Sequence, residues 1–207
     1  MKRLALLVAG VPLVGCVAFP LATPPVRIGI GTGARYATEK ATVDAPAAFH
    51  VGAYPLQLAP EYLGRQLDFG VGYINETGAL HAVQGGYLEG NLAFARDQLG
   101  SALFRGSVGA QLRVLYDPDS PLLGRALAFR LALEISKYFA GPISAHNRDG
   151  GFFGVAAGEA GAGLFLEGSV AQYARDNIVQ VILGVQFRLP ATVGIAYAFY
   201  TGKSQGK

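Results

Sequence analysis

The sequence predicts an all-β protein, an antiparallel meander closed into a single barrel of about eight (8–10) strands after a cleaved signal peptide. From Val26 onward, apolar and polar residues alternate with a period of two, short turn signals interrupt the alternation, and no segment has a convincing helical period. Charged residues make up only 15% of the chain, against about 25% in ordinary soluble domains, and 29 of the 207 residues are glycine. So few charges on so many strands indicate that much of the sheet surface does not face water.

The alternation is clearest in three segments of the chain. In the first of them, apolar side chains such as Leu112 share one parity, and polar ones such as Arg113 share the other. Weaker alternation brings the total to about nine candidate strands, whereas closed bacterial membrane barrels usually have an even number. We therefore expect one misplaced boundary, either near Pro190 or within 152–172. The clear segments are 102–116, 125–139 and 177–189, and the weaker ones are 26–36, 47–58, 66–74, 80–94, 152–172 and 193–200.

Parity separates two faces of this sheet without saying which of them points inward. The polar parity consists mostly of Gly, Ala, Ser and Gln with balanced charges, and its basic residues are all arginine. Small residues suit the narrow interior of a small barrel, and arginine forms bidentate pairs with enclosed carboxylates. We therefore predict a membrane barrel with its apolar face toward lipid and ion pairs in its lumen; the alternative is a lipocalin-like soluble barrel with the opposite arrangement. The predicted ion-pair residues are Arg105, Arg113, Arg130, Arg188, Asp68, Glu134, Glu159 and Glu167, with Arg27 and Glu89 as further members.

The N-terminus has the parts of a bacterial secretory signal. Lys2 and Arg3 form a basic start, and residues 4–14 form an apolar run. A run of this length is too short for a permanent transmembrane helix, which needs about 20 residues. We therefore predict that this segment is a leader and that it is removed from the mature chain.

The leader closes as Leu13-Val14-Gly15-Cys16, which resembles the lipobox of bacterial lipoproteins. The resemblance implies cleavage before Cys16 and acylation of that cysteine with chains such as palmitate. Because Val17 is not Asp, it also implies transfer to the outer membrane. The alternatives are an ordinary secretory signal cut a few residues later, or a core helix with a chance cysteine.

The predicted organisation is a single domain behind a short tether. Residues 1–15 form the lipoprotein signal peptide, 16–25 a proline-rich lipidated tether, 26–201 the β-barrel domain, and 202–207 a polar tail. With Cys16 as the one cysteine, neither a disulfide framework nor a thiolate metal site is expected. Without Lys2 and Arg3 the formal charge falls from +3 to +1, which gives no indication of nucleic-acid binding.

Motifs with catalytic meaning are weak in this sequence. The glycines at 29, 31 and 33 lie inside a strand pattern and lack the spacing of a nucleotide-binding loop. Ser144, His146 and Asp149 cluster in one polar segment, but a mobile glycine-rich loop would be a poor holder for a catalytic pair. We predict no catalytic residue, no metal site and no cofactor other than the covalent lipid on Cys16.

These inferences lead to a hypothesis about function. We expect a non-enzymatic outer-membrane β-barrel lipoprotein, lipid-anchored in the periplasmic leaflet or inserted as a barrel, with a structural or interaction role in the cell envelope. Its partners would be membrane lipid and an envelope protein bound through loops 38–46, 117–124 and 141–151, and its oligomeric state is left open. The first alternative is a periplasmic lipocalin-like barrel that binds an apolar ligand. The second is a lipid-modifying barrel enzyme that uses His146 or His81.

Overall fold

The computed structural model describes residues 16–39, 41–58, 66–79, 82–118, 120–147, 150–173 and 177–199. Nearly all of them lie in β-strands, and the exceptions are turns and one short 3-10 helix, η1. Among these residues, no helix is long and apolar enough to cross a membrane. The elements are β1 (Cys16–Thr23), β2 (Val26–Ala37), β3 (Thr42–Asp44), β4 (Ala47–Ala53), η1 (Pro55–Leu58), β5 (Leu67–Thr77), β6 (Ala82–Leu99), β7 (Ala102–Asp117), β8 (Ser120–Asn147), β9 (Gly150–Gln172), β10 (Asn177–Leu189) and β11 (Ala191–Phe199).

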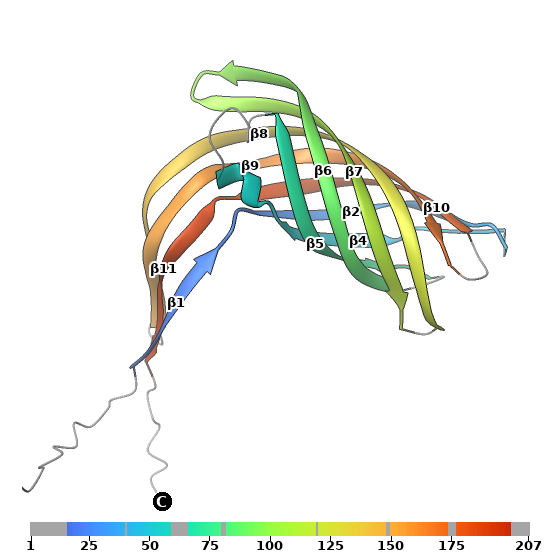
Figure 1. Ribbon diagram of the computed structural model, residues 1–207, viewed down its shortest axis with the longest axis horizontal. Helices are drawn as coiled ribbons and strands as arrows, with labels where there is room; N and C mark the ends of the chain where they lie inside the picture. Colours follow the sequence, from blue (N-terminus) through green and yellow to red (C-terminus); the bar gives the residue numbers. More distant parts are fainter. Residues whose placement is uncertain are drawn as a thin grey trace, which may run out of the picture.

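Eight of these strands form a closed ring (Figure 1). The ring runs β2, β4, β5, β6, β7, β8, β9, β10 and closes where β10 pairs with β2, and every pair in it is antiparallel. The short strand β3 folds back on the end of β2. The predicted fold class, an all-β meander closed into a barrel of about eight strands, is therefore confirmed.

The remaining strands continue beyond one end of the ring. There β1 pairs with β11, β11 pairs with the first part of β9, and β9 pairs with the last part of β8. We call this four-stranded sheet the extension; it comprises residues 16–23, 138–147, 150–158 and 191–199. Figure 1 shows it bending away from the barrel, with the start of β1 and the end of β11 at its tip. The barrel end that carries the extension is called the extension end below, and the opposite end is called the turn end.

The extension corrects two expectations from the sequence. Residues 16–25 were expected to be a free tether, but 16–23 form β1, whose Thr23 hydroxyl lies 2.6 Å from the hydroxyl of Thr192 in β11. Residues 141–151 were expected to be a loop, but nearly all of them form the end of β8 and the start of β9. The other two predicted loops are also short, because β3 occupies part of 38–46 and β8 begins at Ser120.

The boundary that the sequence left uncertain near Pro190 coincides with a break in register. On β9, Gly161 pairs with Arg188 and Ala157 pairs with Ala191, so the three residues between them on β9 face two, Leu189 and Pro190, on the neighbouring chain. Gly158 adopts a φ of 132° at this bulge, a conformation that favours glycine. Pro190 therefore separates a barrel strand, β10, from an extension strand, β11, whereas 152–172 is one continuous strand.

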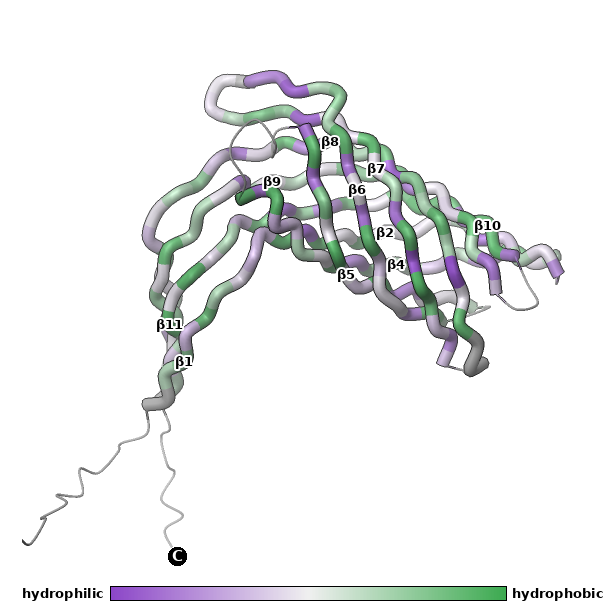
Figure 2. Tube along the Cα trace, in the orientation of Figure 1, coloured by the Kyte–Doolittle hydropathy of each residue, from purple (hydrophilic) through white to green (hydrophobic). Residues whose placement is uncertain are grey.

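Side chains in the ring alternate as the sequence indicated, with the apolar parity outward. Leu131 and Val181 are 43% and 50% exposed, whereas Arg113 and Glu134 on the polar parity are 2% and 3% exposed. Figure 2 shows the same alternation as changing colour along β5, β6 and β7. The outer surface of the barrel is thus apolar, and charged groups are enclosed.

The apolar surface has the height that a membrane barrel needs. Outward residues of β10 are all apolar from Val179 to Leu189, ten residues apart, and at about 3.3 Å per residue this stretch is ~33 Å long. With a strand tilt of about 40°, it spans ~25 Å along the barrel axis, the height of the apolar band of outer-membrane barrels. Partly exposed tyrosines, Tyr36 and Tyr116, lie on the outer face toward the turn end. The architecture is that of a small outer-membrane-type β-barrel.

Candidate functional site

The barrel interior contains two layers of ion pairs, and the first lies toward the extension end. Asp68 of β5 accepts from the guanidinium groups of Arg27, at 3.0 Å, and Arg188, at 3.3 Å. Glu134 of β8 accepts from Arg188 at 2.7 Å and from the side-chain amide of Gln186 at 2.6 Å. Each carboxylate bridges strands that are far apart in the sequence, so this layer links opposite walls of the barrel.

The segment between β4 and β5 covers this first layer. Tyr54 follows β4 and is fully buried; its phenol donates to Glu89 at 2.5 Å, and its ring lies 4.2 Å below the Arg27 guanidinium. Gln57 in η1 donates to Asp68 at 3.0 Å. A short helix after an inward-pointing tyrosine thus folds under the barrel and closes its lumen at the extension end.

The second layer lies at the middle of the barrel. Glu167 of β9 accepts from two guanidinium groups, those of Arg113 and of Arg130, the latter at 2.6 Å. Arg113 also donates to Glu76 at 3.2 Å, and Arg130 contacts the Nδ1 atom of His50 at 2.6 Å. All five side chains are at most 5% exposed. The layer holds two arginines and two glutamates, so its charges cancel when His50 is neutral.

Toward the turn end the interior becomes apolar. Leu115, Ile178 and Ile74 are at most 4% exposed and pack together with Tyr87 and three alanines. Tyr173, which follows β9, packs against this cluster, and its burial raises the pKa of its phenol above the usual range. Beyond it, Arg35 donates twice to Asp44 in β3, at 2.9 and 2.7 Å.

The described residues leave little empty space in the lumen. Two cavities among the polar side chains each have a volume of about 10 Å³, which is the room that one water molecule needs. One lies between Arg27, Asp68 and Arg105, and the other between Arg35, Glu76 and Tyr173. Within this part of the chain, the interior is a packed polar core rather than a channel or a ligand pocket.

One group of residues in the second layer has the composition of a metal site. Single ligand atoms of His50, Glu76 and Glu167 lie within 4.8 Å of one another, and the Nε2 atom of His50 makes no hydrogen bond. However, both carboxylates already bind guanidinium groups, and a divalent cation would add two uncompensated charges to a neutral, buried layer. The donor set therefore fits an ion-pair network better than a metal ion.

The structure buries the residues that the sequence selected as lumen ion pairs, with one exception. Glu159 lies at the rim with its side chain 19% exposed, where it binds Arg105 at 2.9 Å and Arg96 at 3.4 Å. Sequence reasoning missed His50 and Arg35, although Arg35 shares its parity with Arg27 on the same strand. Glu76 was also missed, although it shares its parity with Asp68, so a stricter use of alternation could have found both. The predicted members found inside are Arg27, Asp68, Glu89, Arg105, Arg113, Arg130, Glu134, Glu167 and Arg188.

The histidine cluster suggested by the sequence lies in the extension. Ser144 and His146 are exposed, two residues apart near the tip of β8, and therefore on one face of the sheet. Asp149 and His81 lie outside the described residues. The residue predicted to carry lipid, Cys16, is the first residue of β1 and pairs with Phe199.

Comparisons with known proteins find remote structural likeness. No family model and no curated protein matches this chain. The crystal structure of Neisserial surface protein A (NspA) matches with a TM-score of 0.43 and 10% identity, over 84% of this chain and 98% of that chain. A triple mutant of the Rhodopseudomonas blastica porin matches with a TM-score of 0.15 and 7% identity, over 84% and 100% of the two chains. Both likenesses are too remote to bear on the function of this chain.

Proposed function

We propose that this protein is an outer-membrane β-barrel lipoprotein with a non-enzymatic, structural or interaction role in the cell envelope. One observation carries the proposal: the barrel turns a continuous apolar face outward and encloses its charges in a packed lumen. Exposing so many large apolar side chains to water would be costly, whereas lipid solvates them. The same packing argues against conduction and supports a role in which the barrel is an anchor.

The alternative of a lipocalin-like carrier needs the opposite arrangement. Such a barrel keeps polar residues outside and holds its ligand in an apolar cavity. Here the described interior is filled by Arg, Glu and Gln side chains, and Phe129 and Leu183 on the outer face are 62% and 60% exposed. The described interior is therefore too polar to hold an apolar ligand.

The proposal includes no catalytic activity. The buried histidine, His50, contacts the Arg130 guanidinium and two aromatic rings inside the barrel, where the described residues leave no room for a substrate. The exposed pair of Ser144 and His146 lies at the tip of a hairpin, and neither side chain is buried by neighbours that would fix its position. Unaltered lipid A and phospholipid profiles after deletion of the gene are the expected result.

The interaction role is assigned to the extension end. At the turn end the strands are joined by short connections, whereas the extension end carries η1, the β6–β7 hairpin and the whole extension. This end also holds Cys16, the residue that the lipobox resemblance selects for acylation. In an inserted barrel with termini in the periplasm, a partner in the envelope would meet these elements first.

A fractionation experiment with Cys16→Ala tests the proposal. The variant is expected to remain with outer membranes, to need detergent for extraction, and to migrate differently on gels before and after boiling, because the folded barrel itself holds it in the membrane. The unchanged protein is the control and should also incorporate labelled palmitate. Release of a soluble, folded variant without detergent would contradict membrane insertion, and absence of label in the unchanged protein would contradict lipidation.

A further inference from the structure

The extension has a surface that is unusual for a sheet outside a barrel wall. None of the residues in its four strand segments, 16–23, 138–147, 150–158 and 191–199, is Asp, Glu, Lys or Arg. At the usual frequency of about one charged residue in four, segments of this total length would carry several. The nearest charges in the sequence are Lys137 and Glu159 at the rim and Arg148 and Asp149 in the connection between β8 and β9. The extension is therefore not built like a sheet that faces water.

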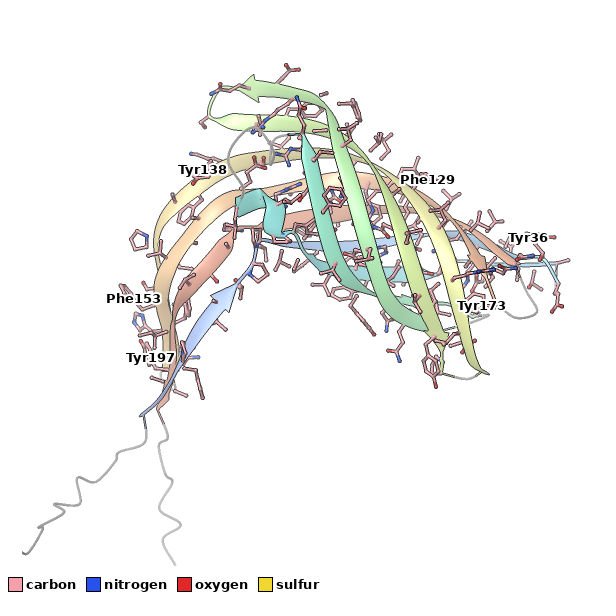
Figure 3. The ribbon with its side chains drawn as sticks, viewed as in Figure 1. Tyr36, Phe129, Tyr138, Phe153, Tyr173 and Tyr197 are labelled. Atoms are coloured by element: carbon pink, nitrogen blue, oxygen red, sulfur yellow. The ribbon has the colours of Figure 1, made fainter. Side chains whose placement is uncertain are left out.

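Large apolar side chains are exposed on the extension. The strand pairing places Tyr138, Phe153, Val193 and Ile195 on one face, and they are 67%, 63%, 64% and 53% exposed. On the opposite face Phe19 in β1 is 54% exposed, among glycines and alanines of the neighbouring strands. Figure 3 shows Tyr138, Phe153 and Tyr197 spread along the length of the extension. A patch of this kind marks a site that a partner or a membrane covers.

The position of Cys16 indicates what covers the exposed apolar side chains of the extension. Cys16 is the first residue of β1, so no flexible spacer separates an acyl group on that residue from the sheet. Acyl chains attached there must lie in a leaflet, and the tip of the extension must then lie at the surface of that leaflet. The nine residues of β11 span only ~30 Å at about 3.3 Å each. The tip of the extension can therefore reach the surface of the membrane in which the barrel is inserted.

The edges of the extension do not favour an added strand from a second copy. Its two outer strands are β1 and the end of β8, and each contains a proline, Pro20 and Pro142. Proline removes a backbone donor and is a common device against edge-to-edge pairing. In the headgroup zone of a bilayer, water and lipid headgroups can bind the remaining backbone groups, which the hydrocarbon core could not do.

We propose that the extension lies in the interfacial zone of the leaflet that holds the acylated Cys16, with lipid covering its exposed apolar side chains. This inference rests on the membrane insertion and lipidation proposed above. It gives the extension a second function beside any protein contact: it braces the barrel against the membrane surface and fixes where the lipid anchor enters.

Fluorescence quenching in reconstituted vesicles tests the proposal. Because acylation occupies the thiol of Cys16, the lipidated protein can carry a single reporter cysteine in place of Phe153 or Phe19, on opposite faces of the extension, and each is labelled with an environment-sensitive fluorophore. Val181→Cys, on the outer barrel wall, is the lipid control, and Gln98→Cys, exposed on the β6–β7 hairpin, is the aqueous control. Vesicles of phosphatidylethanolamine and phosphatidylglycerol contain either ordinary or brominated acyl chains.

We expect brominated lipid to quench the label at Phe153 or Phe19 by at least half of the fraction measured at Val181. Quenching at either position supports the proposal and identifies the covered face. If Val181 is quenched and neither extension position is, the proposal is overturned while membrane insertion of the barrel stands. Self-cross-linking of Phe153→Cys without lipid quenching would overturn it in favour of a second copy of this chain. If Val181 itself is not quenched, the proposed function fails.

Discussion

Replacing Glu167 with Gln tests the ion-paired interior most sharply. The substitution keeps the volume of the side chain but removes the charge that Arg113 and Arg130 share. Arg113 retains Glu76 and Gln111 as acceptors, whereas Arg130 is left with His50 and the ring of Phe165. One buried guanidinium therefore loses the carboxylate that compensates it.

The expected cost follows from the burial of this group. Breaking a buried ion pair costs about 3–5 kcal/mol of stability. Because Gln still accepts one hydrogen bond, we expect Glu167→Gln to lower the free energy of unfolding by about 3 kcal/mol. With a denaturant dependence of about 2 kcal/mol per molar urea, the unfolding midpoint should fall by ~1.5 M. This loss is a large fraction of a stability of about 5–15 kcal/mol.

The assay is urea unfolding of the barrel in vesicles, followed by its gel mobility and intrinsic fluorescence. Glu159→Gln is the matched control, because Glu159 also binds two arginines, but at the rim, with its side chain 19% exposed. We expect Glu159→Gln to lower the free energy of unfolding by about 0–1 kcal/mol, as for solvent-screened pairs. Equal midpoint shifts for the two variants, or none for Glu167→Gln, would refute the idea that the lumen charges hold the walls together.

Three further predictions concern the wall and the lumen. Leu183→Arg near mid-height of the outer face should cost about 2–4 kcal/mol, against about 0–1 for Leu189→Arg near the rim, and refolding yields in vesicles that do not differ would contradict a lipid-facing wall. Gly33→Ala should slow or prevent folding, because its Cβ would overlap the carbonyl oxygen of Val181, whereas Gly168→Ala, with open space around it, should fold normally. In planar bilayers the unchanged protein should give no discrete conductance steps, since its described lumen holds cavities of only about 10 Å³; stable open channels would show that the interior is not packed.

Alternation predicted the barrel wall well because local parity and burial agree there. In 108–116 and 177–189 a residue points outward or to the lumen according to its parity, and the side chain at each position suits an apolar outer face or a polar interior. Arg113, Glu134 and Arg188 could therefore be assigned to the interior. Which of them bind one another could not be predicted, because each pair joins strands that are remote in sequence.

The extension could not be predicted from local signals. Gly141, Pro142 and the glycines at 150 and 151 are turn formers, so the segment indicated a loop, but a full-length pairing of β8 with β9 overrides them. Likewise, the prolines near 20–25 indicated a free tether, whereas β1 pairs with β11, about 170 residues later. The bulge at Gly158 and Pro190 also shifts the strand register. The alternation of apolar and polar residues does not reveal such a shift.

The central claim is that the apolar parity of the wall faces lipid and the polar parity faces a closed lumen. Single cysteines at Val179, Gln180, Val181, Ile182 and Leu183, labelled in vesicles of brominated lipid, measure it along one strand. The structure predicts quenching with a period of two, strong at 179, 181 and 183 and weak at 180 and 182. Strong quenching at 180 and 182, or equal quenching at all five, would contradict it.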